Sequence, residues 1–143
     1  MTTTLASLGT VLLVDDDKVT NLMHQRILDR SGLVDSIDVA TDGLAALEYL
    51  EARANDNKPM PELILLDINM PRLNGFEFLE RYAKLPETFR SSSTLIIMLS
   101  TSVLREDMER AHRDPHVYRF ITKPIDKSDV QTIIHEYHEL VGS

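Results

Sequence analysis

The sequence contains no cysteine and only five glycines among its 143 residues. Without cysteine, disulfides and thiolate metal sites are excluded, and a reducing compartment is compatible with the chain. No Gly-rich phosphate loop follows the first apolar run, which argues against a site that cradles a nucleotide or a flavin there. Metal or phosphoryl chemistry in this chain must therefore use oxygen and nitrogen side chains.

Basic charge and long apolar runs are also scarce. The formal net charge is -8, which argues against binding to DNA or to an anionic membrane through bulk charge. Residues 1–9 are rich in Thr and Ser and lack the basic and apolar regions of a signal peptide, and no run is long enough to span a membrane. We therefore expect a cytoplasmic protein with no nucleic-acid partner and no membrane insertion.

The size and hydrophobic content suit a single domain. Hydrophobic residues make up 43% of the chain, which is enough for one sizeable core. Residues 1–9 are predicted to be a flexible N-terminal lead and residues 10–143 one folded domain, because no linker separates a second one.

Apolar, β-prone runs alternate with helical patterns five times along the chain. In the first helical pattern, Val19, Leu22, Met23 and Ile27 recur at helical spacing, which predicts a helix there. The alternation predicts an α/β fold, a doubly wound sheet of five parallel strands with helices on both faces. The expected strands are 10–14, 37–40, 63–66, 95–99 and 117–121, and the expected helices are 18–30, 42–53, 76–85, 105–113 and 126–141.

Charged residues follow three of the predicted strands. Asp15, Asp16 and Asp17 follow the first, Asp67 follows the third, and Lys123 follows the fifth. The C-terminal ends of parallel strands meet at one edge, so these carboxylates would repel one another there. A hard cation between them, with a lysine nearby, would compensate the repulsion. The pattern therefore indicates a divalent-metal site, with Mg²⁺ expected and Mn²⁺ as the alternative.

The same residues also have structural interpretations. Asp17 directly precedes the first helix and is expected to cap it, and acids in a first helical turn are favoured by the helix dipole. Asp67 could close its strand with an Asx-turn. The other candidates are equally open, since Ser and Thr clusters at strand ends are common turns and most lysines are solvated.

The functional interpretation gives each group a chemical role. Asp67 can accept a phosphoryl group as a covalent nucleophile, while a metal neutralises the charge that opposes attack on a phosphate. Asn69 could provide a backbone carbonyl to the metal. Ser100 can donate to a phosphoryl oxygen, and Lys123 can pair with the phosphoryl charge. Two histidine pairs, His112 with His116 and His135 with His138, are predicted to be solvated.

Four motifs, in their order and spacing, resemble the receiver domain of response regulators in two-component signalling over about residues 9–141. The resemblance implies a stand-alone, chemotaxis-regulator-like domain with the flavodoxin-like strand order 2-1-3-4-5. The motifs are Val-Asp-Asp-Asp at 14–17, Leu-Leu-Asp-Ile-Asn-Met-Pro at 65–71 with Asn74-Gly75, Met-Leu-Ser at 98–100 and Ile-Thr-Lys-Pro at 121–124.

The resemblance also assigns roles to residues. It implies that Asp67 is the phosphoacceptor and that Asp16, Asp67 and the Asn69 carbonyl bind Mg²⁺ directly, with Asp15 acting through water. Ser100 and Lys123 match the hydroxyl and the lysine that contact the phosphoryl group. Phe120 matches an aromatic position that is coupled to the switch in some members.

Two positions near the site bear on its rates. Thr101 stands where the family usually has Ala or Gly, and its β-branched side chain is expected to narrow access to the pocket and slow phosphotransfer or hydrolysis. Ser102, like Asn69, stands where the family tunes dephosphorylation.

We therefore expect a response regulator that receives its phosphoryl group from a sensor histidine kinase or a histidine phosphotransfer protein. It would signal by protein contact to a downstream regulator or by phosphorelay, and catalyse nothing beyond its own phosphotransfer and dephosphorylation. One rival is a receiver-like binding module that is never phosphorylated. The other is an aspartate-nucleophile phosphatase, which would need a general acid at position 69, where Asn69 cannot transfer a proton.

Overall fold

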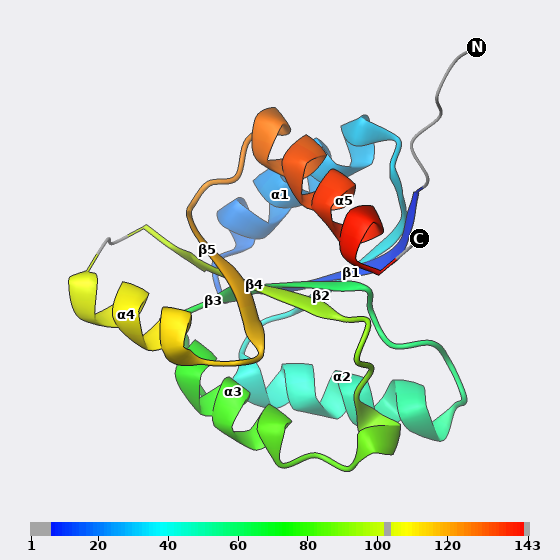
Figure 1. Ribbon diagram of the computed structural model, residues 1–143, viewed down its shortest axis with the longest axis vertical. Coiled ribbons are helices and arrows are strands. Elements are labelled where there is room, and N and C mark those ends of the chain that lie inside the picture. The colour runs from blue at the N-terminus through cyan, green and yellow to red at the C-terminus, as the bar shows by residue number, and fades with distance from the viewer. Residues whose placement is uncertain (1–6, 102–103, 142–143) are drawn as a thin grey trace.

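The computed structural model describes residues 7–101 and 104–141 as five strands that alternate with five α-helices (Figure 1). One short 3₁₀ helix, η1, interrupts the connection between α3 and β4. The strands are β1 (Leu8–Val14), β2 (Val34–Ala40), β3 (Leu63–Asp67), β4 (Leu95–Ser100) and β5 (Val117–Thr122). The helices are α1 (Lys18–Ser31), α2 (Gly43–Asn55), α3 (Gly75–Ala83), η1 (Glu87–Phe89), α4 (Arg105–Arg113) and α5 (Lys127–Leu140).

The five strands form one parallel sheet in the order β2-β1-β3-β4-β5, which confirms the predicted fold. Helices α1 and α5 cover one face, and α2, α3 and α4 cover the other (Figure 1). Each face has its own apolar cluster, because side chains of a strand alternate between the two faces. All strands run the same way, so their C-terminal ends meet at one edge.

The three central strands are apolar throughout because both of their faces are covered. Every residue of β3 is buried, as are all but one in each of β1 and β4. The outer strands β2 and β5 have mixed burial patterns with several exposed positions. The sheet therefore carries its most buried strands in the middle, where β1, β3 and β4 end beside one another.

Side-chain caps fix where most helices begin. Asp17 caps α1 as predicted, by accepting the N–H of Val19, and Asp42 caps α2. Capping boxes start α3 and α5, where Asn74 and Asp126 are the cap residues. Gly32, with a φ of 68°, ends α1, because glycine adopts the left-handed conformation at the lowest cost.

Several predicted boundaries were wrong by a few residues. Strand β1 begins at Leu8, inside the lead predicted for 1–9, and residues 1–6 lie outside the described part of the chain. Strand β2 begins at Val34 rather than 37. The apolar patterns are incomplete at these ends, but pairing between Leu8 and Val34 extends both strands.

The helix predicted at 18–30 is present as α1, but of its apolar residues at helical spacing only Ile27 is partly buried against the core. Val19, Leu22 and Met23 are 65%, 50% and 41% exposed. The buried residues are instead Asn21, His24 and Leu28. Two of these three side chains are polar, which is tolerated only where buried polar groups find hydrogen-bond partners.

A hollow of about 970 Å³ lies at the edge opposite the carboxylates. It is bordered by the starts of β4 and β5 and by the connection that contains η1. It contains none of the predicted site residues. No helix in the described ranges is both long and apolar enough to cross a membrane.

Candidate functional site

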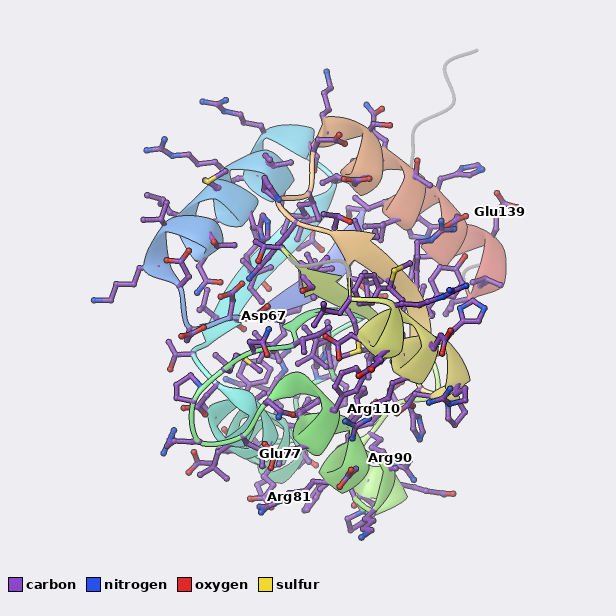
Figure 2. The ribbon with its side chains drawn as sticks, turned by 90° about the vertical axis from the view of Figure 1, so that its left-hand side faces the viewer. Asp67, Glu77, Arg81, Arg90, Arg110 and Glu139 are labelled. Carbon is purple, nitrogen blue, oxygen red and sulfur yellow. The ribbon has the colours of Figure 1, made fainter. Side chains whose placement is uncertain are left out.

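The predicted site residues gather at the C-terminal edge of the sheet. Asp67 and Ser100 are the last residues of β3 and β4, Asp15 follows β1, and Lys123 follows β5. Figure 2 looks onto this edge and shows Asp67 between the two helical layers. The convergence of parallel strand ends, predicted from the order of the runs, brings together residues up to 108 positions apart.

Three carboxylates form a cluster there. Asp15, Asp16 and Asp67 each offer an oxygen, and these oxygens all lie within 4.8 Å of one another. Asp15 and Asp67 are only 4% and 5% exposed, whereas Asp16 is exposed. The Asp17 side chain instead caps α1, so the cluster contains three of the four predicted acids.

Lys123 lies against the two buried carboxylates. Its Nζ donates to Asp15 Oδ2 at 2.8 Å and to Asp67 Oδ1 at 2.9 Å. The three ionised carboxylates and one ammonium leave a formal charge of −2 in a largely buried cluster. One divalent cation would neutralise that charge.

Burial and charge act in opposite directions on the groups of this cluster. Burial raises the pKa of Asp67, the hydrogen bond from Lys123 only partly offsets it, and the charge of Asp15 adds to the increase. Burial also disfavours the charged form of Lys123, but its hydrogen bonds to Asp15 and Asp67 outweigh burial and raise its pKa. Lys123 therefore stays protonated, and Asp67 is the carboxylate whose charge is costly.

The raised pKa of Asp67 predicts how pH changes the stability of the metal-free protein. Between the ordinary value of 3.8 and the folded pKa, the native state binds more protons at Asp67 than the unfolded state does. The contribution of Asp67 therefore favours folding at low pH and is lost as pH rises through the folded pKa.

The measurement is the free energy of unfolding of wild type and Asp67→Asn in EDTA, from about pH 4 to 7. The free energy of unfolding of the variant should rise relative to that of the wild type as pH increases, since only the wild type acquires a buried negative charge at position 67. A difference that stays constant over this range would contradict the prediction.

A close backbone contact holds the turn after Asp67. A Cβ on Gly75 would lie 2.5 Å from the Asp67 carbonyl oxygen, so only glycine allows α3 to begin this close to the end of β3. The Gly75 N–H also donates to the Ile68 carbonyl at 2.8 Å. The Asn74-Gly75 pair seen in the sequence thus caps α3 and sets the path of the chain that follows Asp67.

The remaining predicted residues differ in how far the folded chain buries them. Ser100 is buried at the end of β4, and its carbonyl accepts the N–H of Lys123 at 3.0 Å. Asn69 and Thr101 are exposed. Phe120 is half-buried in β5, where it pairs in register with Met98. Ser102 lies outside the described residues, and the tuning roles of all these side chains stay predictions.

One ion pair at this edge was missed from the sequence. Asp42, the cap of α2, accepts two hydrogen bonds from Arg72, at 2.7 and 3.2 Å. Burial alone would raise the pKa of Asp42, but these bonds and the capped backbone outweigh it and lower that pKa. The pair links the turn after β2 to the turn after β3. An aspartate that follows a strand, as Asp42 does, was the available signal.

Asn21 and His24 were also not predicted from the sequence, and they make hydrogen bonds next to residues of the cluster. The Asn21 Nδ2 donates to the Asp15 carbonyl at 2.8 Å, and the His24 Nε2 accepts the N–H of Ile125 at 3.3 Å. Their spacing with Leu28 fits one helical face and could have identified them. Of the histidines considered from the sequence, His112 and His135 are exposed as predicted, whereas His116 and His138 are half-buried.

The donor set fits a hard divalent cation. All candidate ligand atoms are oxygens, and oxygens bound to one Mg²⁺ at about 2.1 Å lie at most about 4.2 Å apart. A cluster within 4.8 Å needs only a small inward shift to reach that spacing. The buried charge of two carboxylates with one lysine between them supports the same conclusion.

Comparison with known proteins identifies the family to which these features belong. A family model for the response regulator receiver domain matches residues 11–135. The probable methanogenesis regulatory protein FilR2 of Methanothrix harundinacea is 29% identical over 90% of this chain and 81% of its own length. The response regulator Rcp1 of Synechocystis is 31% identical over 84% of this chain and 80% of its own length.

Solved structures agree with this match. A two-component response regulator from Cytophaga hutchinsonii has a TM-score of 0.85 at 25% identity and covers 93% of this chain and 98% of its own. The Mn²⁺-bound form of Rcp1 has a TM-score of 0.67 at 29% identity, covering 91% of each chain. The phosphorylated cyanobacterial phytochrome response regulator RcpA has a TM-score of 0.71 at 30% identity, covering 96% of each chain.

Proposed function

Because the chain belongs to the family of response regulator receiver domains, we propose that it accepts a phosphoryl group on Asp67 from a phosphohistidine donor, in a Mg²⁺-dependent reaction. The observation that carries this proposal is the buried pair Asp15–Asp67 with Lys123 bound to both. Such a cluster is costly to fold, and it suits a site that binds a cation and a phosphoryl group.

The transfer requires little covalent chemistry from the protein. A carboxylate oxygen of Asp67 forms the new bond to phosphorus while the bond from phosphorus to the donor's histidine nitrogen breaks. The electron pair of the broken bond returns to the imidazole. The protein's contribution is to hold Asp67 in line and to stabilise the charge on the phosphoryl oxygens.

The chain's own residues divide these tasks. Lys123, which stays protonated, would move its ammonium from the carboxylates toward a phosphoryl oxygen, and the Ser100 hydroxyl would donate to another. Asp15, Asp16, Asp67 and the Asn69 carbonyl would hold Mg²⁺. The bound metal supplies charge neutralisation at the phosphoryl oxygens. That Rcp1 has a Mn²⁺-bound form and RcpA a phosphorylated one supports the same chemistry here.

Asp16 provides a direct test of the metal site. Mg²⁺ at 100 times its dissociation constant should stabilise the wild type by about 2.7 kcal/mol. Asp16→Asn removes one ligand, so Mg²⁺ should shift the melting temperature of this variant far less. Asp56→Asn, an exposed change at the end of α2, serves as the control. Equal Mg²⁺ shifts in wild type and Asp16→Asn would count against Asp16 as a ligand.

Receiver domains work with histidine kinases, and we propose a sensor histidine kinase or a histidine phosphotransfer protein as the donor, in the cytoplasm. Contacts of the phosphoryl group with Ser100 and Lys123 would bias the surface formed by α4, β5 and α5, where Leu104 and Met108 are exposed. A downstream regulator or relay protein would read this change as a coupling free energy of roughly 1–3 kcal/mol.

The proposal is tested by incubating the protein with acetyl phosphate and Mg²⁺ and measuring its intact mass. One phosphoryl group per chain, lost in hydroxylamine and dependent on Mg²⁺, is expected. Absence of any acyl phosphate would favour the unphosphorylated binding module. Continuous turnover of a small phosphoester would favour the aspartate-nucleophile phosphatase, although Asn69 cannot act as the general acid that this chemistry needs.

A further inference from the structure

The buried face of α1 is polar where a helix that packs on a core is normally apolar. Asn21 and His24 are 6% and 1% exposed, while three apolar side chains of the same helix face solvent. Packing alone would favour the opposite arrangement, because a buried polar group loses its water. The polar face must therefore be explained by the contacts that it makes.

Asn21 holds the end of β1. Its Nδ2 donates to the Asp15 carbonyl, and the Asp15 N–H donates to the Ala40 carbonyl at 3.1 Å. The buried Asn21 Oδ1 has no hydrogen-bond partner among the described residues, so this side chain carries an unpaired polar atom while it makes the Nδ2 bond. The Nδ2 bond holds the main-chain carbonyl of Asp15, and with it the position from which the Asp15 carboxylate extends.

His24 holds the chain that follows Lys123. Its Nε2 accepts the N–H of Ile125, which is 1% exposed and lies two residues after the lysine. Burial lowers the pKa of His24, so the neutral imidazole keeps this nitrogen as an acceptor at neutral pH. Without His24, the Ile125 N–H would be a buried donor with no acceptor.

Both hydrogen bonds come from one helix, α1, and each is made to the main chain next to a residue of the cluster, Asp15 or Lys123. Asp15 and Lys123 are 108 residues apart in the sequence, and their side chains are joined at 2.8 Å. Helix α1 contacts the main chain next to each of them, on one side through Asn21 and on the other through His24. A shift of either main-chain segment would change the spacing of the carboxylate cluster.

We propose that Asn21 and His24 are positioning residues, which from the buried face of α1 hold the Asp15 peptide and the peptide after Lys123 so that the cluster keeps the spacing needed for a divalent cation. The inference rests on the proposed function for its biological meaning. It goes beyond that function because neither residue touches the metal or the phosphoryl group. Residues that orient metal ligands typically change metal affinity about 10- to 100-fold when they are replaced.

The test is titration of the unphosphorylated protein with Mg²⁺ alone, by calorimetry, well below the melting temperature of each variant. His24→Leu and Asn21→Leu remove the two hydrogen bonds and should each weaken Mg²⁺ binding about tenfold or more. His24→Gln restores an acceptor and should stay within about twofold of wild type. Amide exchange at Ile125 should be faster in His24→Leu and close to wild type in His24→Gln.

Leu28→Ala is the matched control, since Leu28 lies on the same buried face and its side chain belongs to the apolar cluster. It should lower the melting temperature while Mg²⁺ affinity stays within about twofold. Equal loss of affinity in Leu28→Ala and His24→Leu would overturn the inference, as would wild-type affinity in both leucine variants. If His24→Leu does not fold, the Mg²⁺ affinities of Asn21→Leu and His24→Gln test the inference, with the same expected changes relative to wild type.

The metal titration separates this inference from the proposed function. Loss of affinity in the leucine variants, together with no phosphorylation of the wild type, would overturn only the phosphoacceptor function. Normal phosphorylation of the wild type, together with unchanged affinity in the variants, would overturn only the positioning role. A wild type that binds no Mg²⁺ would overturn both the inference and the metal site.

Discussion

Asp67→Asn should accept no phosphoryl group from acetyl phosphate or from a histidine-phosphorylated donor. The asparagine amide keeps the shape of the carboxylate, but its oxygen is not a charged nucleophile, and no acyl phosphate can form on it. Because the acceptor atom itself is lost, the expected effect is a fall to background. The measurement is intact mass or radiolabel incorporation under conditions in which the wild type is labelled.

The control for this experiment is Asp56→Asn, which changes the net charge by the same amount at an exposed position, the C-cap of α2, outside the carboxylate cluster. This variant should be labelled at the wild-type rate. The folded state of Asp67→Asn should be checked by melting in EDTA, where it is expected to be at least as stable as wild type. Hydroxylamine-labile labelling of Asp67→Asn at the wild-type level would show that the acceptor is another residue.

Lys123→Met should produce the largest loss of stability among single changes at the site. The Lys123 side chain is 9% exposed and its ammonium is bonded to two carboxylates whose side chains are even more buried, so its removal leaves two negative charges facing each other. Breaking a buried pair by removing one partner costs about 3–5 kcal/mol. Methionine keeps the length and most of the apolar contact of lysine, so the loss should come mainly from charge.

The measurement is denaturant unfolding of Lys123→Met in EDTA and in Mg²⁺. A bound cation would replace part of the missing positive charge, so Mg²⁺ should recover more stability in this variant than in wild type. Lys127→Met, at the exposed first position of α5, is the control and should change stability little. A metal-free Lys123→Met as stable as wild type would show that Asp15 and Asp67 do not depend on this lysine.

The sequence alone was enough to predict the layout of the fold and most of the acidic cluster. Apolar runs such as 63–66 are long enough for strands and too short for helices, and their alternation with helical patterns leaves few topologies. In a parallel sheet every strand has its C-terminal end at the same edge, so the aspartates that follow β1 and end β3 lie at one edge. Asp15, Asp16, Asp67 and Lys123 could therefore be grouped without knowledge of any distance.

Strand ends and the polar loop after α3 were less predictable. The first residues of β1 and β2 lack an apolar pattern, and it is their pairing, between Leu8 and Val34, that makes them strand. The connection at 86–93 contains the short helix η1, which a polar composition does not reveal. In both cases the deciding interactions come from other segments of the chain.

Only the tertiary structure decided which face of α1 is buried. Val19, Leu22 and Met23 stand at helical spacing in the sequence but are exposed, because a spacing pattern takes no account of polar partners elsewhere in the chain. In the folded chain, Asn21 donates to the carbonyl of Asp15, six residues away, and His24 accepts the N–H of Ile125, 101 residues away. These hydrogen bonds offset the cost of burying the two polar side chains. The sequence determined which charges would share an edge, since strand direction alone brings them together. How tightly those charges are held depends on hydrogen bonds between distant segments, which exist only once the sheet and both helical layers have formed.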